Sequence, residues 1–473
     1  MAAGGEAADL VEDEAFQQSL AACRAQRDVD YPQVSALKLP VLRKLFEACR
    51  DAHDRTRWQR FEAFRRERGE VLARNCLFLA LRGHFAGSEP RRPDWRTWPK
   101  EYRDPDSQEV ARFARSHRQE VDFLAWLQWV ADEQLEAAAE AAAACGMAIG
   151  LYRDLAVGAD RAGAETWANA AAVASDAQVG APPDIFNPAG QDWGLPPFQP
   201  RALRQEGYRS FIELVRANMR HAGGLRIDHV MGLQHLYWVP AGRGPTDGAY
   251  VQYPMEDMVG ILALESHRQR CLVVGEDLGT VPEGFRERMA AANILSYRVL
   301  FFEQDADGGF LPPEEYPALA LAVIGSHDLP TLNGWWRGRD LEIKAGLGLF
   351  PDEGEAASQD ELRRRGRAAL LEALRAQGLL PARGDPDFMA LSRAAHAFLA
   401  RTPSLLAMVQ LDDLTAELDP VNVPATSEEH PNWRRRQSRT LEELPGEPSF
   451  QEVVAVLREA RGRPARVAPP QRG

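Results

Sequence analysis

The sequence predicts an α/β protein in which a helical part precedes a parallel β-sheet covered by helices. Up to residue 145, apolar residues recur at spacings of three and four, which is the period of an amphipathic helix. Beyond residue 145, short apolar runs alternate with helical stretches, as in a parallel sheet that is buried on both faces. Such sheets occur in βα barrels and in doubly wound folds, and the runs alone leave both open.

Three helices are expected in the first part, at Val34–Cys49, Arg57–Gly83 and Gln108–Cys145. The segment Ser88–Asp106 is rich in Pro, Arg and Trp, so we expect a loop there. Alanine and glutamate dominate Leu135–Ala144, which predicts an exposed end to the third helix, because these residues are strong helix formers.

Six apolar runs are candidate strands: 147–152, 224–229, 271–276, 296–302, 320–326 and 404–410. A closed βα barrel needs eight strands, so the count is two short. Neither GxGxxG nor GxxxxGK[ST] follows any run, which removes the best support for nucleotide binding. The expected domains are a mainly helical part with an insertion subdomain (1–145), a catalytic βα-barrel portion with a helical insertion at about 330–403 (146–460) and a disordered tail (461–473).

Charge and cysteine content narrow the class of protein. The formal net charge of −13 argues against nonspecific binding to nucleic acid or to anionic membranes, since both require a surplus of positive charge. The five cysteines are widely spaced and form no CxxC pair, so neither a metal knuckle nor a disulfide framework is expected. Free thiols, no signal peptide and no long apolar run predict a cytoplasmic protein.

Three of the runs end in carboxylates. Arg226 and Asp228 share one face of the second run, because side chains alternate along a strand. Glu276 and Asp277 end the third run, and His327 and Asp328 end the fifth. In a βα barrel the carboxyl ends of the strands form the active-site face, although a single Asp at such a position is often a helix cap.

A pair of carboxyl groups with a charged helper is typical of glycosidic bond cleavage, which needs a proton donor and a carboxylate at the anomeric carbon. Asp, Glu and His also bind metal ions, so a metal cage is the alternative. No HExxH motif occurs and no ligand spacing repeats, which favours the glycosidic reading.

The same segments carry a family resemblance. LRIDHVMG around Asp228, VVGEDLGTVP around Glu276 and GSHDLPTLNGWW around Asp328 resemble the catalytic signatures of the amylomaltases, the 4-α-glucanotransferases of glycoside hydrolase family 77. Similar matches run from about Asp28 to Leu457. The resemblance implies a TIM (β/α)8-type barrel with helical insertions and a reaction that requires no cofactor and no metal.

By this resemblance, Asp228 is the nucleophile, Glu276 the general acid/base and Asp328 the carboxylate that holds sugar hydroxyls. The residue types agree with these roles. Arg226 is expected to keep Asp228 ionised. Partial burial is expected to raise the pKa of Glu276, so that it carries a proton near neutral pH. His327 is expected to donate to a sugar hydroxyl.

Other family positions imply sugar-binding residues. Asp154, at the end of the first run, matches an aspartate that supports the site, with a helix cap as the alternative. Asp184, Gln191 and Trp193 lie in a Pro- and Gly-rich loop, 179–198, that is expected to bind sugar and to shield the intermediate from water. A tryptophan in a loop also serves as a core or hinge residue.

The 420–436 segment supplies the last set of site residues. Asn422 and Asn432 match positions near the donor site, whereas the arginines after Trp433 also fit a solvated face. Ala425 departs from the family, which commonly has glycine there, and its methyl group is tolerated unless the turn needs a positive φ.

A larger departure is at the front of the chain. Nothing before Asp28 resembles the family segment that supplies the first two barrel strands and a Ser-Pro-Tyr motif, so we expect a barrel that lacks these two strands. The resemblance predicts a retaining 4-α-glucanotransferase that acts on maltodextrins and starch- or glycogen-like α-1,4-glucans. An α-amylase-like hydrolase and, because of the missing strands, an inactive glucan-binding fragment are the alternatives.

Overall fold

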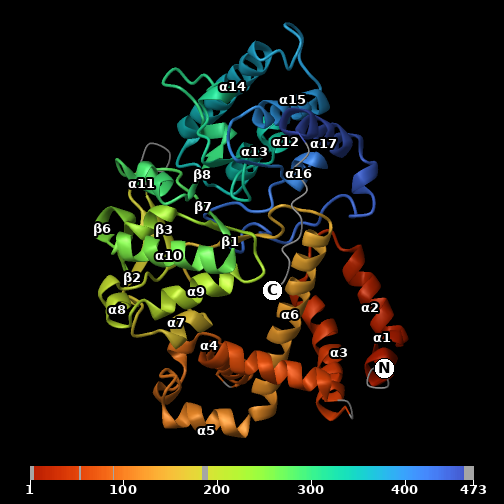
Figure 1. Ribbon diagram of the computed structural model, residues 1–473, viewed down its shortest axis with the longest axis vertical. Coiled ribbons are helices and arrows are strands. Elements are labelled where there is room, and N and C mark those ends of the chain that lie inside the picture. The colour runs from red at the N-terminus through yellow and green to blue at the C-terminus, as the bar shows by residue number, and fades with distance from the viewer. Residues whose placement is uncertain (1–4, 53–54, 89, 184–189, 463–473) are drawn as a thin grey trace. The chain divides into compact units, whose positions relative to one another are not determined.

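The computed structural model describes residues 5–52, 55–88, 90–183 and 190–462 (Figure 1). These residues pack as two compact units. Within the described ranges, the first unit comprises residues 5–24 and 31–273, and the second comprises residues 25–30 and 274–462. Each unit has its own strands and helices and is described by itself.

The first unit begins with helices. They are α1 (Gly5–Glu12), α2 (Glu14–Ala25), α3 (Tyr31–Asp51), α4 (Thr56–Ala86), α5 (Gln108–Ser116) and α6 (Arg118–Ala144). The first two expected helices are confirmed as α3 and α4. The third expectation was wrong in one respect, because the helix breaks at His117, where φ is −113°. The ring of His117 stacks on Phe113 at 3.9 Å, and its Nδ1 lies 3.1 Å from the Phe113 carbonyl oxygen.

An aromatic core joins α3, α4 and α6. Phe46 of α3 meets Phe123 and Trp126 of α6 edge to face, with ring centroids 5.5 and 5.9 Å apart. Burial of such large rings is the main stabilising contribution of these helices. The end of α6, from 135 to 144, is mostly exposed, as expected from its composition. Among the described residues of the 88–106 segment, two short 3-10 turns are found, at Trp95–Thr97 and Lys100–Tyr102.

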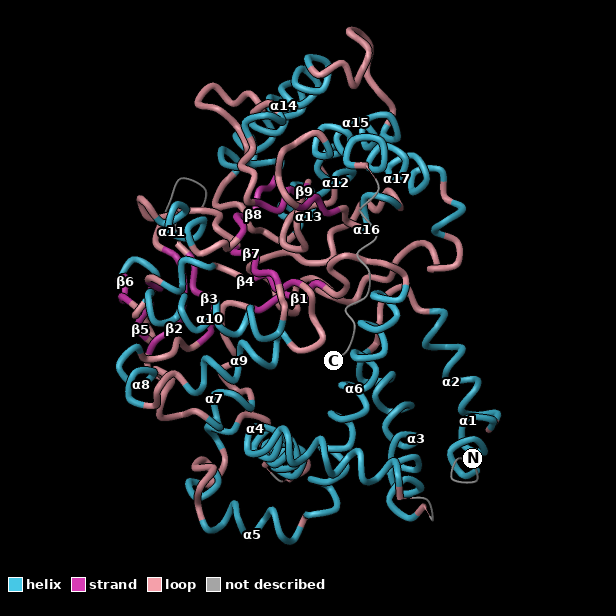
Figure 2. The backbone as a smooth tube through the Cα atoms, viewed as in Figure 1, coloured by secondary structure: helices cyan, strands magenta, loops and turns pink. Residues whose placement is uncertain are grey.

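Two groups of strands follow in the first unit (Figure 2). In the parallel group, β1 (Tyr152–Leu155) pairs with β4 (Gly224–Ile227), and β7 (Leu272–Gly275) begins beside β4, where the Leu272 N–H donates to the Gly223 carbonyl oxygen at 2.9 Å. The other group is antiparallel, in the order β3 (Gln191–Leu195), β2 (Ala177–Ala181), β5 (His235–Pro240), β6 (Ala249–Gln252). The sequence patterns did not predict this second sheet.

Glycine at position 223 permits the close pairing of β1 and β4. A Cβ atom at Gly223 would lie 1.6 Å from the carbonyl oxygen of Ile149, so no side chain fits there. Helix α9 (Arg209–Met219) packs on both strands and against α10 (Met255–Gln269). Shorter helices α7 (Ala164–Ala168) and α8 (Pro200–Gln205) complete this unit. The glycine therefore allows the close approach of the two strands that carry the site residues of this unit.

The second unit continues the parallel series from β7, whose last two residues belong to it. β8 (Leu295–Val299) pairs with β7 and with β9 (Ala320–Val323), and β9 pairs with β10 (Leu406–Met408), all in parallel. Each of the six runs predicted from the sequence therefore contains or adjoins a strand: β1, β4, β7, β8, β9 and β10. Six parallel strands are found among the described residues, against the eight of a closed barrel.

Helices surround these strands in the second unit. They are α11 (Phe285–Ala291), α12 (Leu332–Arg337), α13 (Arg339–Gly346), α14 (Glu353–Ala376), α15 (Phe388–Ala400), α16 (Leu411–Leu414) and α17 (Pro448–Arg461). The helices α12 to α15 lie between β9 and β10, in the range 330–403 where a helical insertion is expected. The tail expected from 461 lies, from residue 463 onward, outside the described residues. Among the described helices, none has the length and apolar character needed to cross a bilayer.

Candidate active site

In the first unit, Arg226 organises two carboxylates at the ends of β1 and β4. Its Nη1 donates to both oxygens of Asp154 at 2.7 and 2.8 Å, and its Nη2 donates to Oδ1 of Asp228 at 2.7 Å. The parallel register places Asp154 directly beside Arg226. Arg226 is 6% exposed, and its hydrogen bonds to the two carboxylates are charge-assisted. The expected pairing of Arg226 with Asp228 is confirmed, and Asp154 is the second partner of the same guanidinium.

The backbone holds Asp228 where β4 ends. Its N–H donates to the Leu155 carbonyl oxygen at 2.9 Å, which is one bond beyond the strand. The next residue, His229, turns the chain with a positive φ of 47°. Burial, aided by the nearby His235, lowers the pKa of His229 to about 4, so that its imidazole is neutral at physiological pH.

A cavity of about 350 Å³ lies beside these residues, within the first unit. Asp154, Asp228 and His229 supply polar groups to its wall. Apolar residues make up most of the remaining wall, among them Leu155, Val157, Pro197, Phe198, Leu203, Phe211, Leu236 and Met258. Few polar groups on an apolar wall are typical of a ligand site.

Trp193 lies near this cluster, on a strand. Its ring meets that of His229 edge to face at 5.3 Å, and its Nε1 donates to Oε1 of Gln191 at 3.0 Å. The expectation of a loop at 179–198 was therefore wrong for both residues, since Gln191 and Trp193 belong to β3, paired with β2. Glycine and proline suggested a loop, but Gly180 is a strand residue whose added Cβ would lie 2.0 Å from the Gln191 carbonyl oxygen. Asp184 lies outside the described residues.

In the second unit, Glu276 and its neighbour have different surroundings. Glu276 follows β7, is 8% exposed, and accepts a hydrogen bond from the Leu278 N–H at 2.8 Å. Asp277 is held by Arg286 at 2.8 Å, by the Ser296 hydroxyl at 2.5 Å and by the Tyr297 N–H at 3.0 Å. Asp277 thus ties the end of β7 to α11 and β8, and the burial expected for Glu276 is confirmed.

Asp328 follows β9, and the side chains of His327 and Asn422 lie against its carboxylate. Nε2 of His327 lies 3.1 Å from its Oδ2, and Nδ2 of Asn422 donates to its Oδ1 at 2.8 Å. The His327 ring also lies 5.1 Å from that of Trp433, which is 50% exposed. The structure therefore brings together three of the predicted residues, Asp328, His327 and Asn422, and adds an exposed aromatic ring beside them.

The loop from 420 to 433 is held by Asn432. Its Oδ1 accepts from the Val423 N–H at 2.9 Å, and its Nδ2 donates to Thr426 at 2.8 and 3.1 Å. The side-chain amide of Asn432 is therefore hydrogen-bonded within the loop that carries Asn422. Ala425, in the same loop, has φ of 68°, so the turn does need a positive φ. The alanine therefore pays a conformational cost that a glycine would avoid.

A buried carboxyl, which the sequence patterns did not single out, anchors the segment after Asp328. Oδ1 of Asp413 accepts from the Leu332 N–H at 2.8 Å, and Asp413 is 0% exposed. Two further hydrogen bonds join the same segments, from Thr331 to the Glu417 carbonyl oxygen and from Asn333 to the Ala416 carbonyl oxygen. Burial raises the pKa of Asp413 to about 7.

The chain is similar to known proteins over most of its length. A family model described as 4-alpha-glucanotransferase matches residues 6–441. The 4-alpha-glucanotransferase of Haemophilus influenzae is 38% identical over 440 residues, which cover 90% of this chain and 63% of that protein. The one of Mycobacterium tuberculosis is 42% identical over 378 residues, which cover 79% and 51%. The chain thus spans about half to two thirds of the length of these curated relatives.

Two solved structures have the same fold. The amylomaltase of Corynebacterium glutamicum has a TM-score of 0.81 and 32% identity, covering 91% of this chain and 60% of that one. The amylomaltase of Streptococcus agalactiae, solved in complex with acarbose, has a TM-score of 0.73 and 18% identity, covering 92% and 80%. At this lower identity the second likeness concerns the fold alone.

Proposed function

Because this chain belongs to the 4-alpha-glucanotransferase family, whose model spans residues 6–441, we propose that it takes part in transfer of α-1,4-glucan segments between maltodextrins. The observation that carries the proposal is the Arg226 fork, which pairs with Asp228 and Asp154 together. A guanidinium at 2.7 Å favours the ionised form of Asp228, the form in which a carboxylate attacks an anomeric carbon.

The roles follow from the chemistry of a retaining transferase. Asp228 attacks the anomeric carbon while Glu276 gives a proton to the departing glucan oxygen. Glu276 then removes the proton from the 4-hydroxyl of the incoming sugar, which attacks the glucosyl-enzyme and releases Asp228. Asp328, set by Asn422 and His327, accepts hydrogen bonds from sugar hydroxyls. Each of these steps transfers a proton or a glycosyl group, and the three carboxyl groups named above are sufficient for them.

Transfer in place of hydrolysis requires that a sugar acceptor competes with water. We assign this task to the β2–β3 segment with Gln191 and Trp193, and to Trp433 beside His327, since aromatic faces bind sugar rings. The Trp193 ring lies against His229, next to Asp228 in the sequence, which supports this assignment. We also place the activity in the cytoplasm, where the five cysteines remain thiols.

The test is incubation of the purified protein with maltotriose, followed by chromatographic analysis of the products. The proposal predicts glucose and a ladder of maltodextrins longer than the substrate, unchanged by EDTA. An Asp228→Ala protein serves as the control for contaminating activity. Glucose and maltose without longer products indicate a hydrolase and contradict transfer, whereas loss of the ladder with EDTA contradicts the metal-free reaction.

A further inference from the structure

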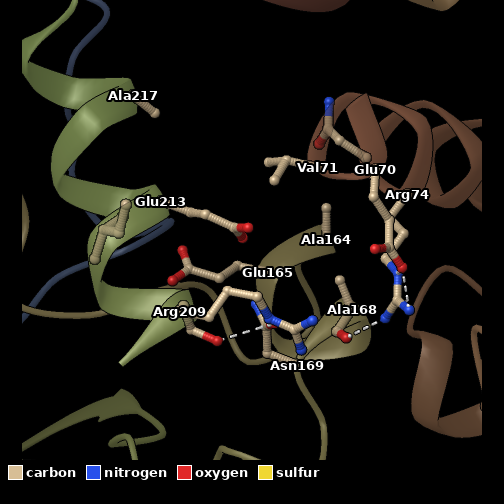
Figure 3. A pocket seen from close by; sticks show the side chains of 13 residues that line it. Glu70, Val71, Arg74, Ala164, Glu165, Ala168, Asn169, Arg209, Glu213 and Ala217 are labelled. Carbon is tan, nitrogen blue, oxygen red and sulfur yellow. Dashed lines mark hydrogen bonds and ion pairs between the residues drawn. The ribbon is translucent and has the colours of Figure 1, made fainter. Parts of the chain in front are cut away.

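A second cavity of about 220 Å³ lies in the first unit between α4, α7 and α9 (Figure 3). Neither Asp154 nor Asp228 lines it, and Glu165 is common to its wall and to that of the cavity beside Asp228. Its apolar wall consists of Val71, Ala164, Ala168, Leu214 and Ala217. Its polar groups are Glu70, Arg74, Asn75, Glu165, Asn169, Arg209, Ser210 and Glu213.

The two arginines of this cavity already have acidic partners. Arg74 donates to Glu70 at 2.8 Å, to Asp106 at 2.9 Å and to the Ala168 carbonyl oxygen at 3.1 Å. Arg209 lies 3.8 Å from Glu206. Their charges are therefore largely compensated, and the cavity offers little attraction to an anion.

Glu165 and Glu213 differ from these pairs. Within the described parts of the chain, neither carboxyl group forms an ion pair or a side-chain hydrogen bond, and Figure 3 shows both side chains reaching into the cavity, from α7 and from α9. Burial raises the pKa of Glu165 to about 7, and burial also raises the pKa of Glu213, which Arg209 partly opposes. Two acceptor groups thus line a partly open cavity, and neither is hydrogen-bonded to a described side chain.

We propose that this cavity binds a small aliphatic ammonium ion, with Glu165 and Glu213 as its acceptors. An ammonium group has three donors and no acceptor, so it matches carboxylates that lack partners. Its hydrocarbon part fits the wall of Val71, Leu214 and Ala217. A metal ion fits less well, because among the described residues no cluster of three or more His, Cys, Asp or Glu side chains is suited to hold one. The proposal does not rest on the transferase activity.

Binding requires that Glu165 releases its proton, so affinity should depend on pH. The charged and titratable groups around Glu165 in its two cavities are Glu70, Arg74, Arg209, Glu213, Asp154, Asp228, His229 and Tyr253. With a pKa of about 7, Glu165 is mostly protonated at pH 6 and mostly ionised at pH 8. Ammonium binding is therefore expected to be about tenfold tighter at pH 8 than at pH 6.

Isothermal titration calorimetry with n-butylammonium chloride tests the proposal on the whole chain. The measurement is made at pH 6 and pH 8 at constant ionic strength, with 1-butanol as a neutral ligand of similar size. Glu165→Gln and Glu213→Gln remove one acceptor charge each while keeping the side-chain shape. Glu136→Gln, on the exposed face of α6, is the matched control. Circular dichroism confirms that each variant is folded.

We expect saturable binding at pH 8 that weakens about tenfold at pH 6, is lost in Glu165→Gln, weakens in Glu213→Gln and is unchanged in Glu136→Gln. No saturable binding by the folded wild-type protein at pH 8 overturns the proposal. Equal affinity for 1-butanol also overturns it, since the cavity then selects apolar bulk and not charge. Binding that survives in folded Glu165→Gln places the ammonium elsewhere and overturns the assignment.

Discussion

Arg226 lies on the same strand face as Asp228 and joins its Oδ1 at 2.7 Å, while its other nitrogen holds Asp154 of the neighbouring strand. One buried guanidinium thus sets the position of two carboxylates whose backbones lie on β4 and β1. This fork favours the charged form of the Asp228 side chain and sets its direction, as a nucleophile requires.

Arg226→Lys is expected to lower kcat/KM for maltotriose by about tenfold to a hundredfold, since a single ammonium cannot reproduce the planar fork and one charge-assisted hydrogen bond is lost. Steady-state kinetics measure the effect. Arg243→Lys, at an exposed position of the same unit, is the control and should behave like the wild type. Wild-type kinetics in folded Arg226→Lys contradict the role of the fork.

Asn422 is expected to act on Asp328 and not on the fold as a whole. Asn422→Ala removes the donor at 2.8 Å, and Asn422→Asp also puts a second carboxylate beside Asp328, which repels it. Activity should therefore fall in Asn422→Ala and fall further in Asn422→Asp, with little change in melting temperature. Equal activities of the two variants would show that a negative charge at position 422 does not affect Asp328.

Asp413 should make stability depend on pH. Its pKa rises from 3.8 in the unfolded chain to about 7 in the folded one, so stability is lost as pH rises between these values. Asp413→Asn keeps the acceptor for Leu332 and removes the charge. Its free energy of unfolding relative to wild type should therefore increase by ~2 kcal/mol from pH 5 to pH 8. Thermal unfolding at both pH values measures this.

The control for Asp413 is Asp385→Asn, at an exposed position of the same unit. The free energy of unfolding of Asp385→Asn should change between pH 5 and pH 8 as it does in the wild type. If Asp413→Asn shows the same pH dependence as the wild type, Asp413 is ionised in the folded protein and the burial argument is wrong.

The parallel strands could be predicted because burial on both faces leaves a continuous apolar run, and the residue that ends such a run is visible in the sequence. Arg226 and Asp228 share a face through the two-residue period, and that local prediction is confirmed. The pairing of Arg226 with Asp154 depends on the register of two strands 72 residues apart, which no local pattern contains.

Other contacts between residues that are distant in the sequence could not be predicted for the same reason. Asp413 contacts Leu332 across 81 residues, and Asp413 lies in none of the patterns that the sequence offers. In the β2–β3 pair, the glycine at 180 looks like a loop signal, whereas the structure uses it to let two strands approach closely. Composition shows that a glycine is present, but only the fold shows why that position requires a glycine.

The backbone at Ala425 offers a stability test. With φ at 68°, alanine carries a left-handed strain of about 1–2 kcal/mol, while a glycine loses some of that gain through the entropy of the unfolded chain. Ala425→Gly should therefore stabilise the protein by roughly 0.5–1 kcal/mol in urea unfolding. Ala407→Gly, in strand β10, should destabilise it. A loss of stability in Ala425→Gly contradicts the strained turn.

Mass spectrometry of the Glu276→Gln protein after exposure to maltosyl fluoride shows directly which carboxylate is the nucleophile. Fluoride leaves without a proton from Glu276, so Asp228 should still be glycosylated. The adduct should persist because no base activates the acceptor. We expect a maltosyl adduct on the peptide that contains Asp228, and none in the Asp228→Ala, Glu276→Gln double variant. A folded Glu276→Gln protein with its adduct on the Asp328 peptide would contradict the assignment of nucleophile and stabiliser.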